Sequence, residues 1–241
     1  MTIPTTEVPV PALVRRLAGG AYLEPVWLNE AGGVTWRTGD GRYVKYAPHD
    51  DEVSLADEAA RLAWAAPYAT VPRVLENGAD ATHEWLVTVA LPGRSAVDAR
   101  WIAEPATAVR AVGRGLRMLH DALPVDGCPF AWTVPVRLEA AARRGIRVPS
   151  ALHEPPPVDR LVVCHGDACV PNTLLNDDGG PLGHVDLGAL GIGDRWADIA
   201  VASMSTAWNY GPGWEDELIA AYGMPPDRER LDYYRDLWNA T

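Results

Sequence analysis

The pattern of hydrophobic and polar positions in the first 91 residues predicts a sheet accompanied by two helices. Apolar residues recur at helical spacing over residues 11–18 and 51–66, and Pro67 closes the second helix. Alternating apolar and polar positions predict strands at residues 22–28, 34–38, 42–46, 71–76 and 85–90. The Gly39-Asp40-Gly41 triplet is typical of a hairpin turn, so the second and third strands are expected to pair.

Beyond residue 91 the pattern becomes mainly helical, and Leu91-Pro92-Gly93 marks the change. Helical spacing predicts helices at residues 104–122, 136–144, 195–208, 214–222 and 227–238. Two short apolar runs, residues 161–164 and 182–187, predict strands in this half. The sequence therefore predicts an α+β protein with a sheet-rich part over residues 1–91 and a larger helical part over residues 92–241.

Polar residues accompany both short apolar runs of the second half. The triplet His165-Gly166-Asp167 follows the first run, Asp186 lies in the second, and Asn172 lies between them. Carboxylate and amide oxygens are ligands that Mg²⁺ prefers, and protein-bound Mg²⁺ commonly shares its coordination sphere with substrate phosphates. A Gly-Asp pair alone would be ordinary turn chemistry. The complete set favours phosphoryl transfer, with Asp167 as the catalytic base and Asn172 and Asp186 as Mg²⁺ ligands.

The only lysine, Lys45, stands out because the other 20 of the 21 basic residues are arginine. In kinases a strand lysine contacts the nucleotide phosphates and is held by a glutamate of the next helix. Glu58 lies in the next predicted helix, so we expect a Lys45–Glu58 ion pair. The alternative is a surface glutamate that contacts Arg61 along the helix. A P-loop is excluded, because Val44 rather than glycine precedes the lysine.

Net charge and cysteine content limit the kinds of binding partner and the cellular compartment that are expected. A formal net charge of -11 argues against nucleic acid and suits a cationic small molecule, although acidity also serves solubility. Cys128, Cys164 and Cys169 form no disulfide framework, which indicates the reducing cytoplasm. Zinc binding is a weaker interpretation than buried thiols at this spacing. No signal peptide or membrane-spanning run is present, so we expect no membrane association.

The pattern H-G-D-x4-N, followed 14 residues later by Asp186, resembles the catalytic and metal segments of the aminoglycoside phosphotransferases. The resemblance extends from TGDGRYVKYAP through DEAARLAW to DRERLDYYRDLW. It implies a two-lobed protein-kinase-like fold, with a small sheet-rich N-lobe and a larger helical C-lobe. It also implies a kinase that moves the gamma-phosphate of ATP or GTP to a hydroxyl of an aminoglycoside antibiotic with Mg²⁺. A monomer or weak dimer is expected.

Further residue roles follow from this resemblance. Tyr43 is placed where an aromatic ring stacks on the nucleotide base, with an exposed strand tyrosine as the alternative. Backbone groups of Val89 and Leu91 are placed at the edge of the base. His165 is expected to support Asp167. Asp198 is expected to brace the catalytic loop through backbone amides, with a surface or capping role as the alternative.

The part of the chain that is expected to bind the antibiotic departs from the family pattern. Ala189 stands where members commonly have arginine, Trp238 and Asn239 stand where they have acidic residues, and the stretch between Cys128 and His165 is shorter. Carboxylates hold ammonium groups through charge-assisted hydrogen bonds, so these changes weaken the case for a highly cationic acceptor. Three alternatives stay open: a kinase of another hydroxylated antibiotic such as a nucleoside or peptide, a kinase of a small metabolite, or a non-catalytic nucleotide-binding pseudokinase.

Overall fold

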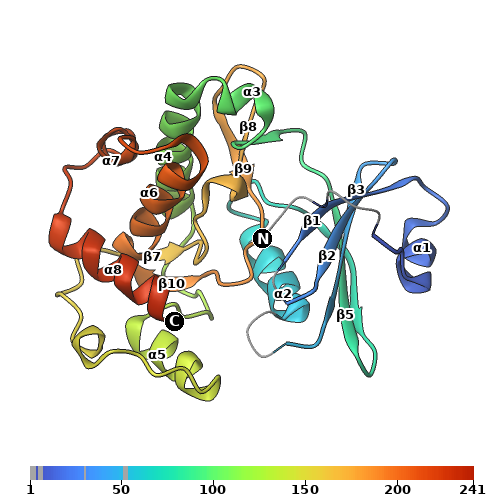
Figure 1. Ribbon diagram of the computed structural model, residues 1–241, viewed down its shortest axis with the longest axis horizontal. Helices are drawn as coiled ribbons and strands as arrows, with labels where there is room; N and C mark the ends of the chain where they lie inside the picture. The colour runs from blue at the N-terminus through green and yellow to red at the C-terminus, as the bar shows by residue number, and fades with distance from the viewer. Residues whose placement is uncertain (1–3, 5–7, 30, 51–53) are drawn as a thin grey trace. The chain divides into compact units, whose positions relative to one another are not determined.

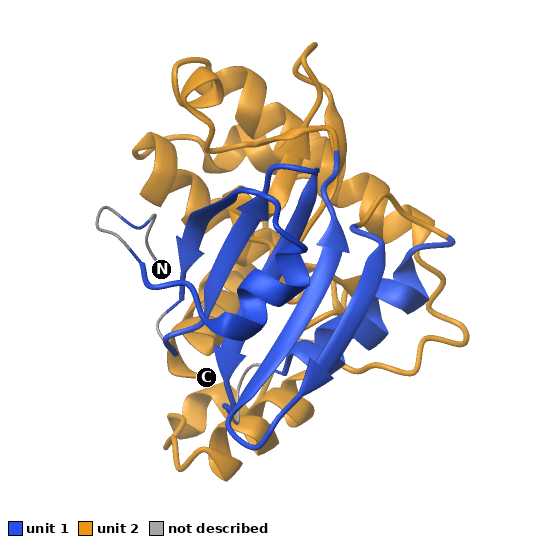
Figure 2. Ribbon diagram, turned by 90° about the vertical axis from the view of Figure 1, so that its right-hand side faces the viewer, with its two compact units in different colours: residues 1–67, 72–91 blue, residues 68–71, 92–241 orange. Residues whose placement is uncertain are grey.

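The computed structural model describes residues 4, 8–29, 31–50 and 54–241, and the chain divides into two compact units (Figure 2). Unit 1 comprises residues 1–67 and 72–91, and unit 2 comprises residues 68–71 and 92–241. Unit 1 is rich in sheet and unit 2 is mainly helical. The predicted α+β class is confirmed.

Unit 1 is built on a five-stranded antiparallel sheet with the strand order β1-β2-β3-β5-β4 (Figure 1). The strands are β1 Leu23–Leu28, β2 Val34–Thr38, β3 Arg42–Pro48, β4 Val74–Ala79 and β5 His83–Val89. Helix α1 (Ala12–Ala18) adds Val14 to a core formed with Trp36, Val44 and Val87 of the sheet. Burial of these apolar side chains is the main favourable contribution to this part of the fold.

The turn between β2 and β3 sets the register of the strand that carries Lys45. Thr38 Oγ1 donates to Asp40 Oδ1 at 2.5 Å, and the Arg42 guanidinium donates to the same carboxylate at 2.7 Å. Hydrogen bonds from Arg42 and Thr38 lower the pKa of Asp40 to about 2. Arg42 also donates to the carbonyls of Leu17 and Ala18 at the end of α1, where carbonyl groups lack partners within the helix.

Helix α2 (Leu55–Ala65) carries Glu58 toward the sheet. Ser54 caps its first turn by accepting from the Asp57 N–H at 3.2 Å, and Glu84 of β5 accepts from the Leu55 N–H at 2.6 Å. One face of the helix is buried, at positions Leu55, Glu58, Ala59, Leu62 and Ala65. The start predicted at residue 51 lies outside the described residues.

The predicted fourth strand is wrong at its start. The prediction covers residues 71–76, whereas β4 spans Val74–Ala79. Pro72 lacks the N–H that a strand ladder needs. Residues 68–71 belong instead to unit 2, where the Thr70 carbonyl accepts from the His184 N–H at 3.1 Å.

Unit 2 combines two small sheets with helices (Figure 1). The helices are α3 Ala99–Ile102, α4 Pro105–Ala122, α5 Val134–Arg143, α6 Trp196–Tyr210, α7 Glu215–Tyr222 and α8 Arg228–Ala240. One sheet pairs β7 (Leu161–Cys164) with β10 (Gly191–Asp194), and the other has the order β6-β8-β9, with β6 Arg94–Ser95, β8 Thr173–Leu175 and β9 Pro181–His184. Short 3-10 helices occur at Ser150–His153 and Val170–Asn172.

The strand predicted over residues 182–187 ends early, at His184. Asp186 has a φ of 66°, a left-handed conformation that lies outside the β region of a regular strand and that non-glycine residues seldom adopt. Such backbone conformations concentrate at functional sites. Within the described residues, no helix is both long enough and apolar enough to cross a membrane.

Candidate active site

The structure brings Asp167, Asn172 and Asp186 together in unit 2. Asn172 ends a 3-10 turn and donates from Nδ2 to the Asp167 carbonyl at 3.0 Å and to Oδ2 of the Asp167 carboxylate at 3.1 Å. The Val185 N–H donates to the Asn172 carbonyl at 3.0 Å, which places the chain that carries Asp186 beside this loop. The three groups singled out by their spacing are therefore neighbours.

The Asp167 carboxyl is largely enclosed. Burial raises its pKa above the ordinary value, and the nearby Asp186 carboxylate also raises it, while hydrogen bonds with Cys169 and Asn172 act in the opposite direction. Its Oδ1 is buried and, among the described residues, accepts no hydrogen bond of ordinary geometry, which leaves the thiol of Cys169 as a weak neighbouring donor. A carboxylate oxygen without a strong donor is suited to receive a proton.

Gly166 makes the tight turn between β7 and Asp167. Its φ is +85°, and a Cβ at this position would overlap the carbonyl oxygen of Ala189. The loop that follows Asp186 therefore rests directly on the Gly166 backbone. Only glycine satisfies both the positive φ and the close approach.

We expect Gly166→Ala to lower the free energy of unfolding by about 3 kcal/mol or more, because left-handed strain and steric overlap add. Gly145→Ala is the matched control, since Gly145 has a φ of +73° and a Cβ added there would meet nothing within 4 Å. That change should cost only about 1 to 2 kcal/mol of backbone strain. Urea unfolding of both variants measures the difference, and equal losses would show that the Ala189 contact is unimportant.

Asp198, in the first turn of α6, holds the loop that carries Asp167. It is 1% exposed, and its carboxylate accepts from the His165 N–H at 2.6 Å and from the Gly166 N–H at 3.0 Å. His120 Nε2 lies 2.9 Å from the same carboxylate. Burial by itself raises a carboxyl pKa, but the hydrogen bond from His120 and the charges and amides around it outweigh burial and lower the pKa of Asp198. The expected contacts with backbone amides are present, so the surface alternative is wrong.

His120 was not predicted as a site residue from the sequence. It lies near the end of α4, its Nδ1 is 2.8 Å from the Tyr222 hydroxyl, and it is 3% exposed. Ser205 was missed as well, and its Oγ accepts from the Val170 N–H of the same loop at 2.9 Å. The sequence contained only a weak indication of these two roles, because His120 and Ser205 are each a polar residue on the apolar face of a predicted helix.

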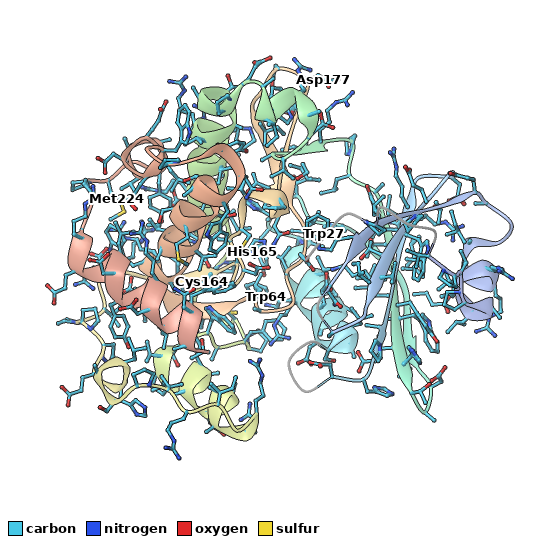
Figure 3. All side chains as sticks on the ribbon, viewed as in Figure 1. Trp27, Trp64, Cys164, His165, Asp177 and Met224 are labelled. Atoms are coloured by element: carbon cyan, nitrogen blue, oxygen red, sulfur yellow. The ribbon has the colours of Figure 1, made fainter. Side chains whose placement is uncertain are left out.

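His165 joins the two loops that carry the carboxylates. Its Nε2 lies 3.0 Å from the Val185 carbonyl, and its Nδ1 accepts from the Asp167 N–H at 3.3 Å. Because a carbonyl can only accept, these contacts assign the ring proton to Nε2. Figure 3 shows Cys164 and His165 in the interior of unit 2, where both are fully buried.

Lys45 and Glu58 form the expected ion pair within unit 1. Lys45 Nζ donates to both carboxylate oxygens of Glu58, at 2.7 and 2.8 Å, and Glu58 is 3% exposed. Arg61, the alternative partner, lies 3.4 Å from Asp57. Bidentate contact with a buried carboxylate fixes the position of the ammonium group.

The predicted base contacts also lie in unit 1. Tyr43 is half-buried on β3 and is paired in register with Thr88. The Val89 N–H already donates to the Arg73 carbonyl at 3.0 Å, so Val89 has only its carbonyl to offer a base. Leu91 is the last residue of the unit. The roles of Tyr43, Val89 and Leu91 in nucleotide binding stay predictions.

The donor set fits a hard cation shared with a ligand. Asn172 turns its Nδ2 toward Asp167, which leaves Oδ1 as the oxygen that can face a cation. Together with the Asp186 carboxylate this makes two oxygen donors from the protein. In the described part of the chain, this site included, no group of three or more His, Cys, Asp or Glu side chains is placed to hold a metal ion. Two protein donors suit Mg²⁺, which takes its remaining ligands from water and phosphate.

The cysteines near the loop are free thiols. Cys164 is fully buried and donates to the Asp194 carbonyl at 3.4 Å, and burial raises the pKa of its thiol. Burial and the neighbouring Asp167 charge likewise raise the pKa of Cys169. Neither thiol is therefore disposed to ionise as a zinc ligand requires.

Comparisons with known proteins agree with this geometry. Residues 14–234 match the family described as the phosphotransferase enzyme family, APH. An aminoglycoside 3'-phosphotransferase of Streptomyces ribosidificus is 35% identical over 86% of this chain and 90% of its own length. The streptomycin 3''-kinase of Streptomyces griseus is 33% identical over 91% and 92% of the two chains.

Solved structures show the same fold. An aminoglycoside-3'-phosphotransferase of type VIII superposes with a TM-score of 0.75 at 30% identity, covering 95% of this chain and 97% of the other. A Streptomyces rimosus aminoglycoside phosphotransferase in complex with ADP and streptomycin has a TM-score of 0.71 at 28% identity, covering 93% and 94%. With a matching family over most of its length, relatives above 30% identity and the same fold, this chain belongs to the phosphotransferase enzyme family.

Proposed function

We propose that this protein transfers the gamma-phosphate of ATP or GTP to a hydroxyl of an aminoglycoside antibiotic and so confers resistance. The observation that carries the proposal is that Asp167, Asn172 and Asp186 lie close together. Asp198 holds the loop that carries Asp167 by accepting from its backbone N–H groups. The aminoglycoside acceptor is supported by relatives whose names specify that substrate.

Each group has a defined task in this reaction. Asp167 orients the acceptor hydroxyl and receives its proton, and the raised pKa of its carboxyl suits it to that role. Asn172 and Asp186 would hold Mg²⁺, which neutralises charge on the transferring phosphate when bound. Lys45, fixed by Glu58, contacts the nucleotide phosphates.

The two parts of the chain would have different functions. Residues 1–91 would form the nucleotide-binding lobe, with Tyr43, Val89 and Leu91 at the base. Residues 92–241 would form the catalytic and substrate-binding lobe. Cytoplasmic action is supported by three free cysteines, which suit a reducing compartment, and by the need for a nucleotide. We expect a monomer or a weak dimer.

One observation favours a less cationic acceptor as the second candidate. The guanidinium of Arg137, 3% exposed, lies 6.0 Å from the Trp238 ring and 5.0 Å from the Trp132 ring. Arg137 is itself buried, so what the end of α8 offers at positions 238 and 239 is an aromatic ring and an amide, without a carboxylate. Ammonium groups bind carboxylates strongly, so these two positions suit a hydroxylated nucleoside or peptide antibiotic better than a highly charged aminoglycoside.

A product assay separates the candidates. The purified protein is mixed with Mg²⁺, ATP or GTP, and aminoglycoside, nucleoside or peptide antibiotics, and products are identified by mass. Phosphate added to an aminoglycoside supports the first candidate. Phosphate added only to another class supports the second, and no transfer to any antibiotic favours a metabolite kinase or a non-catalytic protein.

Lys45→Met should lower kcat/KM for the nucleotide by about 10²- to 10³-fold, because it removes a fixed charge that stabilises the transferring phosphate. Initial rates at varied nucleotide concentration measure the effect. Arg61→Met is the control, since Arg61 lies on the same helix as Glu58 and pairs with the exposed Asp57. If both variants lose activity equally, the predicted phosphate contact of Lys45 is wrong.

A further inference from the structure

His184 is a buried histidine that the proposed chemistry does not use. It is the last residue of β9, two positions before Asp186, and it is 5% exposed. Its ring contacts two other segments of unit 2, the backbone of α4 and the ring of His165.

The first contact of His184 is with the middle of α4. Its ring lies against the backbone of Gly115. A Cβ on Gly115 would lie 3.1 Å from Pro181 Cβ and 3.5 Å from His184 Nε2, so β9 lies directly against the helix backbone. Glycine is unfavourable inside a helix, and this close approach explains its presence. Strand β9 is thereby attached to a long, rigid helix just before the metal-binding loop.

The second contact of His184 is with His165. The two rings meet edge to face, with centroids 5.6 Å apart and an interplanar angle of 70°. Such edge contacts between rings are favourable and depend on orientation. His165 needs one orientation and one tautomer, because Nε2 faces the Val185 carbonyl while Nδ1 accepts from the Asp167 N–H.

We infer that His184 is a positioning residue of the active site: anchored on Gly115, its ring holds His165 in the tautomer and orientation that join the Asp167 loop to the strand leading to Asp186. The inference rests on the proposed phosphoryl transfer. His184 acts on the Asp167 loop through His165. Residues that orient active-site groups in this way commonly affect activity about 10- to 100-fold.

The test compares three variants. His184→Ala removes both contacts, His184→Phe keeps an aromatic edge against His165, and Leu175→Ala is the control. Leu175 is fully buried on β8, the strand next to β9, so its truncation costs stability without reaching His165. Each variant is assayed for kcat, for nucleotide KM and for unfolding temperature, at a temperature where all are folded. The ¹⁵N chemical shifts of the His165 ring report its tautomer.

His184→Ala should lower kcat by about 10- to 100-fold with little change in nucleotide KM, and His184→Phe should recover part of the loss. In His184→Ala the His165 ring should shift from a single Nε2–H tautomer to a mixture. The inference is overturned if the tautomer is unchanged, if His184→Phe is no better than His184→Ala, or if Leu175→Ala loses kcat equally. Because the ¹⁵N measurement needs no acceptor, it remains decisive if the antibiotic substrate proves to be different.

Discussion

Asp167→Asn is expected to lower kcat by about 10²- to 10⁴-fold, the usual contribution of a positioned general base. The asparagine side chain has nearly the same shape and can still accept the hydrogen bond from Asn172 Nδ2. It cannot receive a proton from the acceptor hydroxyl. The loop should therefore keep its structure while the proton transfer fails.

Two measurements distinguish this loss from misfolding. Nucleotide affinity, measured by calorimetry, should remain close to that of the wild type, because Asp167 has no predicted contact with the nucleotide. Asp177→Asn is the control, since Asp177 is an exposed aspartate of the β8–β9 turn in the same unit. A turnover of Asp167→Asn within a few-fold of wild type would rule out Asp167 as the base.

Asp198→Ala is expected to lower the free energy of unfolding by about 3 to 5 kcal/mol, the range for removing one partner of a buried charged network. The change leaves the N–H groups of His165 and Gly166 without acceptors. It also leaves the buried His120 ring without its carboxylate partner. Because those amides define the catalytic loop, activity should fall with stability. The control is Asp216→Ala, because Asp216 is an exposed aspartate in α7. The difference between the two variants in the free energy of unfolding, measured with urea, gives the contribution of the buried Asp198 contacts.

The contribution of Asp198 should also depend on pH. Its pKa is lowered in the folded protein, so the folded state favours the ionised form. The resulting stabilisation is complete well above the ordinary pKa of 3.8 and is lost as the pH falls through the lowered folded-state pKa. The stability difference between the wild type and Asp198→Asn should therefore shrink in acid. A difference that stays constant from neutral to strongly acid pH would contradict this assignment.

The sequence by itself determined most helices and strands and the identity of the main candidate site residues. Periodicity placed α4 because one face of the helix is buried, whereas a short apolar run placed β7, whose last three residues are all buried. Asp167 and Asn172 are five residues apart, so a single loop can bring them together. The Lys45–Glu58 pair could be anticipated because the chain contains no other lysine.

Only the tertiary structure decided which distant side chains hold these groups in place. His120 meets Asp198 across 78 residues of sequence, and His184 meets the backbone of Gly115 on another element. The left-handed turn at Asp186, which shortened the predicted strand, depends likewise on the loops around it. Sequence patterns report local periodicity and spacing, whereas a buried polar group must be satisfied by whatever the fold brings beside it. The partners of His120 and His184 were therefore settled by packing between segments that are far apart in the chain.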